Sequence, residues 1–314
     1  MTDTGRILAL HLGLLALLAA LEFVLPAYHQ GNFARAMVLA SYAIGYNMLF
    51  GYTGLLSLGH AMFFAAGMYG MGLSIRHLGF APAPALLMGI GAGVVVSAVI
   101  GVLALRARGV AFMIVTLMFA QAAYLTILWA GDWTRGDEGF VIQPGDRVLW
   151  GIALSTDDAR YWAAFALFAA CLLISLWVVR RPFGKTLVAI RENEERARML
   201  GYDTARLKLY AVILSGTLSA AAGAAYGLLF GYVGASFGSV QYSILPLLWV
   251  LLGGAGTVLG PFVGTLFMFY LIDLSSGITT AYMLIAGLAL VLLTLFAPQG
   301  LMGEVRRRWA RWLP

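Results

Sequence analysis

Residues 180–208 read RRPFGKTLVAIRENEERARMLGYDTARLK and form a hydrophilic stretch between two long apolar runs. Eight of these residues are Lys or Arg and four are Asp or Glu. Pro182 and Gly184 indicate a turn, and Gly201 fits the left-handed end of a helix. Between them, apolar residues recur at steps of three and four positions, at Leu187, Ile190, Ala197 and Leu200. The pattern predicts an amphipathic surface helix of about four turns, over about residues 186–200, whose apolar stripe is a docking surface. An ordinary basic loop on the cytoplasmic side of a membrane is the alternative.

The composition indicates a membrane protein. The chain of 314 residues is 61% hydrophobic and 11% charged, which is typical of helices that cross a bilayer many times. The net charge of +6 does not indicate nucleic-acid binding, because the basic residues collect in loops. The single cysteine, Cys171, excludes an intrachain disulfide and a cysteine-based metal cluster.

The fold class predicted is all-α, a polytopic transmembrane bundle of about 8–10 spans with glycine-broken helices, forming a single domain over residues 1–314. About 20 apolar residues cross the hydrocarbon core. Ten candidate spans satisfy this length roughly, and the first is read as a retained span. They are residues 6–27, 33–50, 54–75, 84–105, 109–131, 161–179, 208–232, 240–258, 261–275 and 278–297.

The distribution of Lys and Arg predicts the orientation. With both termini in the cytoplasm, 15 of the 20 basic residues face inward, as the positive-inside rule requires. Residues 180–208 then form a cytoplasmic loop, and residues 132–160 form an external loop. Residues 298–314 form a basic cytoplasmic tail that we interpret as a surface anchor, with Arg306, Arg307, Arg308 and Arg311.

Two glycine-rich stretches interrupt the apolar pattern. Residues 51–70 read GYTGLLSLGHAMFFAAGMYG and residues 251–264 read LLGGAGTVLGPFVG. Each glycine disfavours an uninterrupted helix, and irregular backbone at membrane depth occurs where it lines a cavity or is buried in protein. Transporters use such broken helices at substrate sites. Pro261 is expected to start a helix.

Catalytic and metal sites are not indicated. His60 has no second ligand at metal-binding spacing, so a metal site is not expected. Gly184, Lys185 and Thr186 resemble the end of a phosphate loop, but position 179 is Val and no strand precedes them. The chain is therefore not expected to be an enzyme.

Several blocks in order resemble one family, the M-type permeases (LivM family) of branched-chain amino acid ABC importers. The resemblance runs from about Tyr42 to Gly303. Its blocks contain Gly51, Tyr52, Gly54, Ser57, Gly59 and His60; Phe112, Thr116, Leu117, Phe119 and Ala120; Thr134, Gly136 and Gly139; Pro182, Phe183, Gly184, Ala189, Ile190, Arg191, Glu192, Asn193, Glu194, Ala197, Leu200, Gly201 and Lys208; Gly253, Gly254, Gly256, Thr257, Gly260 and Pro261; and Pro298, Gly300 and Leu301.

The resemblance implies a permease subunit in the bacterial inner membrane that forms a heterodimer with a homologous H-type permease. It implies two cytoplasmic ATPase subunits, which carry ATP and Mg, and an external solute-binding protein; this chain itself is expected to hold no cofactor. We hypothesise that the substrate pathway is lined by Asn47, Ser57, His60, Thr116 and Gln121. We hypothesise that ATPase coupling uses Arg191, Glu195, Ala197 and Gly201.

The solute stays open, because permeases for urea, amides and carboxylates are closely related. An ion-coupled secondary transporter is an alternative mechanism. It needs buried acids near the midplane, and the only carboxylates within predicted spans, Glu22 and Asp273, fall toward the outer ends. A membrane-embedded enzyme is a further alternative that lacks an evident nucleophile or metal set.

Overall fold

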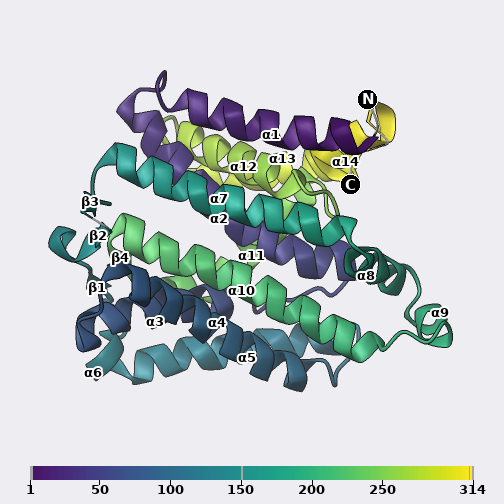
Figure 1. Cartoon of the computed structure of the whole chain (residues 1–314), viewed down its shortest axis with the longest axis horizontal. Helices are drawn as coiled ribbons and strands as arrows, with labels where there is room; N and C mark the ends of the chain where they lie inside the picture. The colour runs from purple at the N-terminus through teal and green to yellow at the C-terminus, as the bar shows by residue number, and fades with distance from the viewer. Residues whose placement is uncertain (1–2, 150, 311, 313–314) are drawn as a thin grey trace.

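The computed structural model describes residues 3–149, 151–310 and 312. Within them, ten helices correspond one to one with the predicted spans and run along the bundle (Figure 1). They are α1 (Asp3–Leu21), α2 (Ala27–Thr53), α3 (Ala61–Leu78), α4 (Pro82–Ala104), α5 (Val110–Trp129), α7 (Asp157–Arg180), α10 (Thr204–Phe230), α11 (Val240–Gly253), α12 (Gly260–Ser276) and α13 (Tyr282–Phe296). The predicted all-α membrane bundle is confirmed.

Helix length and apolarity differ with position in the bundle. Five described helices, α1, α4, α5, α7 and α10, are long and apolar enough to cross a membrane by themselves. Helix α2 has 27 residues but carries more polar groups, and it is buried almost continuously from Ala34 to Thr53. Because α2 contacts protein on nearly every side, its composition is set by packing and not by contact with lipid.

The two ends of the bundle carry different short elements. One end holds α6 (Gly131–Thr134), β1 (Phe140–Val141), η1 (Pro144–Arg147), β2 (Val148–Leu149), β3 (Ile152–Ala153), β4 (Tyr232–Val233) and η2 (Ala235–Gly238). Strand β1 pairs antiparallel with β4, and β2 with β3. The other end holds α8 (Pro182–Glu192), α9 (Glu194–Met199), α14 (Gly300–Arg308) and both chain termini (Figure 1). We call this second end the α8–α9 end. Arg311 of the predicted tail lies outside the described residues.

Helix α10 packs against α3 and α4 through small residues. A Cβ atom at Gly93 of α4 would lie 2.0 Å from the Cβ of Ala220 in α10, and one at Gly223 would lie 1.9 Å from the Phe64 carbonyl oxygen in α3. Such close backbone approach gives membrane helices their van der Waals contact without a hydrophobic driving force.

The chain is irregular at both glycine-rich stretches. Helix α2 continues to Thr53 and ends at Gly54, which is left-handed with φ of 72°. Helix α3 begins only at Ala61, so the predicted start of the third span at residue 54 was wrong. We call residues 54–60 the first break, and residues 254–259, between α11 and α12, the second break. Pro261 lies in the first turn of α12, as predicted.

Candidate functional site

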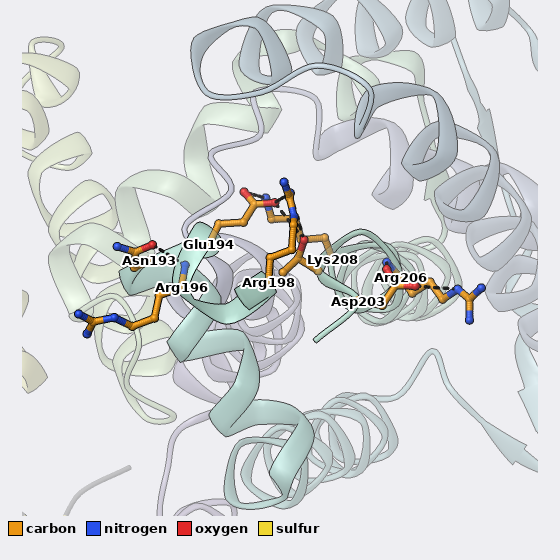
Figure 2. Close-up of polar contacts among 8 residues, drawn as sticks. Asn193, Glu194, Arg196, Arg198, Asp203, Arg206 and Lys208 are labelled. Atoms are coloured by element: carbon orange, nitrogen blue, oxygen red, sulfur yellow. Dashed lines mark hydrogen bonds and ion pairs between the residues drawn. The ribbon is translucent and has the colours of Figure 1, made fainter. Parts of the chain in front are cut away.

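The hydrophilic stretch forms two helices, so the prediction of one continuous helix was wrong. Helix α8 begins at Pro182, and α9 begins after Asn193, whose backbone is extended at φ of −159°. The Asn193 side chain accepts a hydrogen bond from the Arg196 backbone N–H at 2.9 Å (Figure 2). Asparagine is a favoured N-cap because its side chain satisfies an N–H of the first turn, and here it starts a new helix.

The apolar stripe is also divided. Leu187, Ile190 and Ala197 are buried, but Leu200 is 72% exposed. With Met199, the last residue of α9, and Tyr202, Leu200 forms an exposed apolar tip at the end of α9. Of the four residues predicted to form a docking stripe, Leu200 is therefore the exposed one, and the other three pack inside this chain. Figure 1 shows α9 projecting from the bundle of membrane-spanning helices.

Gly201 closes α9. Its φ is 89°, and the Tyr202 N–H donates to the Ala197 carbonyl while the Gly201 N–H donates to the Arg198 carbonyl. This pair of bonds is the Schellman motif, which needs a left-handed residue and favours glycine. The predicted helix end at Gly201 is confirmed. Glu195 is exposed on the first turn of the same helix.

A charge network holds α9 against the start of α10. Glu194 forms ion pairs with Lys208 and with Arg198, the latter at 3.2 Å, and accepts a hydrogen bond from Thr204 (Figure 2). Partial burial by itself would raise the pKa of Glu194, but the hydrogen bonds from Lys208 and Thr204 and the two positive charges outweigh it. The pKa therefore lies below its ordinary value, and the carboxylate is ionised at neutral pH.

Arg191 connects α8 to both breaks. Its Nη1 donates a hydrogen bond to the Gly51 carbonyl oxygen near the end of α2. Its side chain also lies against Gly54, where a Cβ would be 2.9 Å from the Arg191 Cγ, and against Gly256, where a Cβ would be 2.9 Å from Nη1. Any side chain larger than hydrogen at these positions would displace the arginine. Arg191, which was predicted for ATPase docking, is thus exposed at the α8–α9 end and also contacts both breaks.

Asn47 joins α2 to the second break. Its Oδ1 accepts from the Gly256 N–H and its Nδ2 donates to the Thr257 carbonyl, both at 2.9 Å. The side chain is 1% exposed. Since both amide groups are used by the backbone, Asn47 holds the break in place and has a structural part in the site.

The first break is held by several helices. Tyr46 donates to the Ser57 carbonyl at 3.0 Å, and the Leu58 N–H donates to the Thr116 hydroxyl of α5 at 3.3 Å. The Ala61 N–H donates to the Ser243 hydroxyl of α11 at 2.9 Å. Backbone groups freed by the missing helical turn are therefore satisfied by side chains of neighbouring helices.

His60 lies fully buried at the end of the first break. Its Nε2 is 2.9 Å from the Ser215 hydroxyl of α10, which donates its own proton to the Gly45 carbonyl. Nε2 is therefore the donor, and Nδ1 is an acceptor that has no hydrogen-bond partner among the described residues. The rings of Tyr46 and Phe63 pack edge-on against the imidazole.

Gln121 lies apart from the other predicted pathway residues. It is exposed on α5, whereas Thr116 on the same helix is buried at the first break. The exposed face of α5 also carries Ile114, Met118, Leu125 and Trp129. The structure therefore brings Asn47, Ser57, His60 and Thr116 to the two breaks and places Gln121 in an outward-facing apolar stripe.

The two carboxylates of the predicted spans lie at the end opposite α8 and α9. Asp273 accepts hydrogen bonds from Tyr28 at 2.8 and 2.9 Å and from Asn32 at 3.3 Å. Glu22 follows the end of α1 and is buried. Neither side chain is near the two breaks.

Sequence reasoning missed the polar partners of the breaks. Ser215, Ser243 and Arg306 contact them or the residues beside them, and Arg306 of α14 donates to the Gly256 carbonyl at 3.1 Å. The serines are polar residues in otherwise apolar helices, which is the one signal available in the sequence. Arg306 gave no such signal because it lies in a run of arginines.

Comparison with known proteins gives one consistent family. The family described as branched-chain amino acid transport system / permease component matches residues 31–296. The high-affinity branched-chain amino acid transport system permease protein LivM of Salmonella typhimurium is 27% identical, over 94% of this chain and 75% of that protein. LivM of Escherichia coli is 28% identical over 93% and 74%. The autoinducer 2 import system permease protein LsrC of Klebsiella pneumoniae is 30% identical over 45% of this chain and 41% of that protein. No solved structure gives a significant match.

Proposed function

This chain belongs to the branched-chain amino acid transport system permease family, and on that premise we propose that it is the membrane-spanning subunit of an ATP-driven importer. Its solute is a branched-chain amino acid or a related small amphipathic molecule, as the names of the LivM relatives suggest. The protein is a multi-pass membrane protein, and we place it in the bacterial inner membrane with both termini in the cytoplasm. The arginine-rich tail and the α8–α9 end then share the cytoplasmic side.

The partners follow from the same premise. ABC permeases of this kind work with ATPase and solute-binding components, and we propose two ATPase subunits at the α8–α9 end that carry ATP and Mg. A homologous H-type permease completes the pathway. We propose that the H-type permease contacts the exposed stripe of α5, where Gln121 lies among apolar residues, since an amide that faces lipid is unfavourable.

The coupling proposal rests on a series of contacts that connects the tip of α9 to the two breaks. Met199 and Leu200 are exposed at the tip, as is expected of an apolar docking surface. Helix α8 follows any movement of α9 through the Asn193 junction, and Arg191 transmits it to the Gly51 carbonyl and to the second break. Nucleotide-driven closure of the ATPases would thus shift the irregular segments that carry Ser57 and His60.

The test is ATP-dependent uptake of leucine by vesicles that contain the whole importer. Glu195→Gln and Gly201→Ala are expected to stay in the membrane and to leave hydrolysis active while uptake falls about tenfold, because the docking helix is altered at its first turn and at its end. Arg206→Gln is the matched control, since the exposed pair of Arg206 with Asp203 contributes little. Normal uptake in both variants would remove the docking assignment, and uptake that survives ATP depletion but fails with the ion gradient would favour a secondary transporter.

A further inference from the structure

A cavity of about 290 Å³ opens at the α8–α9 end between α8, α11 and α14. Its walls include Arg191 of α8 and Arg306 of α14, together with Gln299 and Gly303. Among the described residues that line it there is no carboxylate, so the cavity is positively charged. This arrangement differs from the network around Glu194, where each cation has an acidic partner.

Two guanidinium groups converge on this cavity. Arg191 donates to the Gly51 carbonyl, and Arg306 donates to the Gly256 carbonyl. These glycines touch, because a Cβ at Gly256 would lie 3.0 Å from the Gly51 oxygen. Within the described part of the chain neither arginine forms an ion pair with a carboxylate, although neighbouring Arg307 and Arg308 both pair with Glu304. The positive charges of Arg191 and Arg306 repel each other across this cavity, and an anion bound between them would offset that repulsion.

An independent observation comes from Tyr52. Its hydroxyl is buried, the residue is 2% exposed, and the described residues offer this hydroxyl no hydrogen-bond partner. The charges of Arg306 and Arg191 both act on it. An unsatisfied buried hydroxyl costs about 1–3 kcal/mol. Tyr52 does not itself line the cavity, so the proposal requires the anion to enter between Arg191 and Arg306 and so supply the acceptor that this hydroxyl lacks.

The start of α14 adds a third group of donors. Pro298 and Gln299 precede this nine-residue helix and line the cavity, and no side chain caps its first turn. The free N–H groups and the positive end of the helix dipole favour a negative group at this position.

We propose that this cavity binds a phosphate group, supplied by the headgroup of an anionic phospholipid of the cytoplasmic leaflet. Two features next to the cavity favour a lipid source. Aromatic side chains are exposed on both sides of α14, at Phe296 and Trp309, and α14 ends in the basic run Arg306, Arg307 and Arg308, as is typical of a segment at the membrane surface. The phosphate bridges α8 to α14 and fixes both breaks. Coupling between the ATPases and the pathway therefore depends on anionic lipid.

The test uses the complete importer, purified and placed in bilayer discs of phosphatidylcholine alone or of phosphatidylcholine with phosphatidylglycerol. Native mass spectrometry counts retained phosphatidylglycerol, and vesicles of the same compositions give ATP-driven uptake. Arg306→Gln should weaken retention about tenfold or more and remove the stimulation of uptake by phosphatidylglycerol, because charge-assisted hydrogen bonds are lost. Arg307→Gln is the matched control, since it removes the same charge from the same helix but outside the cavity.

A second variant distinguishes a loss of lipid binding from misfolding of the Arg306→Gln variant. Tyr52→Phe deletes only the hydroxyl and should weaken retention about fivefold, in keeping with the loss of one hydrogen bond. Inorganic phosphate is added to the phosphatidylcholine discs as a separate probe. Binding of phosphate that depends on Arg306 and Tyr52, without selective retention of lipid, would assign the same site to a free phosphate. Equal retention of phosphatidylglycerol by wild type, Arg306→Gln and Tyr52→Phe, or a partner's carboxylate seated in the cavity, would overturn the proposal.

Discussion

The two breaks have similar glycine-rich sequences but are held in different ways. The first break is fixed by hydrogen bonds from α2, α5 and α11, and His60 at its end bonds to α10. The second break is fixed by Asn47 and by Arg306, and Arg191 lies against it. The first break is therefore tied to several spanning helices, whereas the second is tied to α2 and, at the α8–α9 end, to α14; Arg191 touches both. In our proposal a movement of the α8–α9 end reaches the second break most directly, and Arg191 carries it to the first.

The largest expected effect comes from filling the first break. A Cβ at Gly59 would lie 2.0 Å from the Thr116 carbonyl oxygen, so Gly59→Ala must push two backbones apart and should destabilise the protein by about 3 kcal/mol. At Gly256 the nearest atom is the flexible end of Arg191, and Gly256→Ala should cost about 1–2 kcal/mol through its φ of 72°. Thermal unfolding of the purified chain shows which substitution destabilises it more. Gly91→Ala is the control, because a Cβ at Gly91 would meet no atom of the described residues within 4 Å beyond the backbone of its own helix. Equal effects of the two substitutions would contradict the contrast between the breaks.

The next effect concerns the second break alone. Asn47→Ala leaves the Gly256 N–H and the Thr257 carbonyl buried without partners, at a cost of about 2–3 kcal/mol. Uptake should fall about tenfold even where the variant is present in the membrane at normal level. Asn32→Ala is the control, because its bond to Asp273 lies at the opposite end of the bundle. A similar loss in both variants would show that the effect is general destabilisation.

The smallest effect is a pH dependence at the α8–α9 end. Because the folded pKa of Glu194 lies below its ordinary value, the network around it is fully stabilising above that ordinary value and is lost as pH falls through the folded pKa. The pairs are partly exposed and contribute about 0.5–1 kcal/mol. Hydrogen exchange of residues 194–204 should therefore accelerate in acid beyond the intrinsic change, and Glu194→Gln should remove that difference. Identical profiles for the two proteins would refute the assignment.

Local features of this fold were accessible from the sequence, and long-range contacts were not. Gly201 and Pro261 were predicted correctly because each position is decided by its own backbone geometry. The junction at Asn193 was missed although an asparagine followed by two glutamates is a helix-start signal. The apolar residues were assigned to one docking stripe for the same reason, since a single stripe assumes one continuous helix.

The partners within the site required the structure. Arg191 and Gly51 are 140 positions apart, and nothing in either local pattern relates them. The arginines of the tail were interpreted together as a surface anchor, whereas Arg306 turns toward the second break. His60 could be chosen as a candidate pathway residue from its glycine neighbours, but its bond to Ser215 depends on how α10 packs.

In our proposal Arg191 transmits movement of the α8–α9 end to the two breaks. The measurement is the number of solute molecules imported per ATP hydrolysed by the reconstituted importer, with Arg191→Gln compared with Arg206→Gln, whose exposed side chain pairs with Asp203. We expect Arg191→Gln to assemble and hydrolyse ATP while this ratio falls about tenfold, and Arg206→Gln to match the unmodified chain. An unchanged ratio in Arg191→Gln would contradict it.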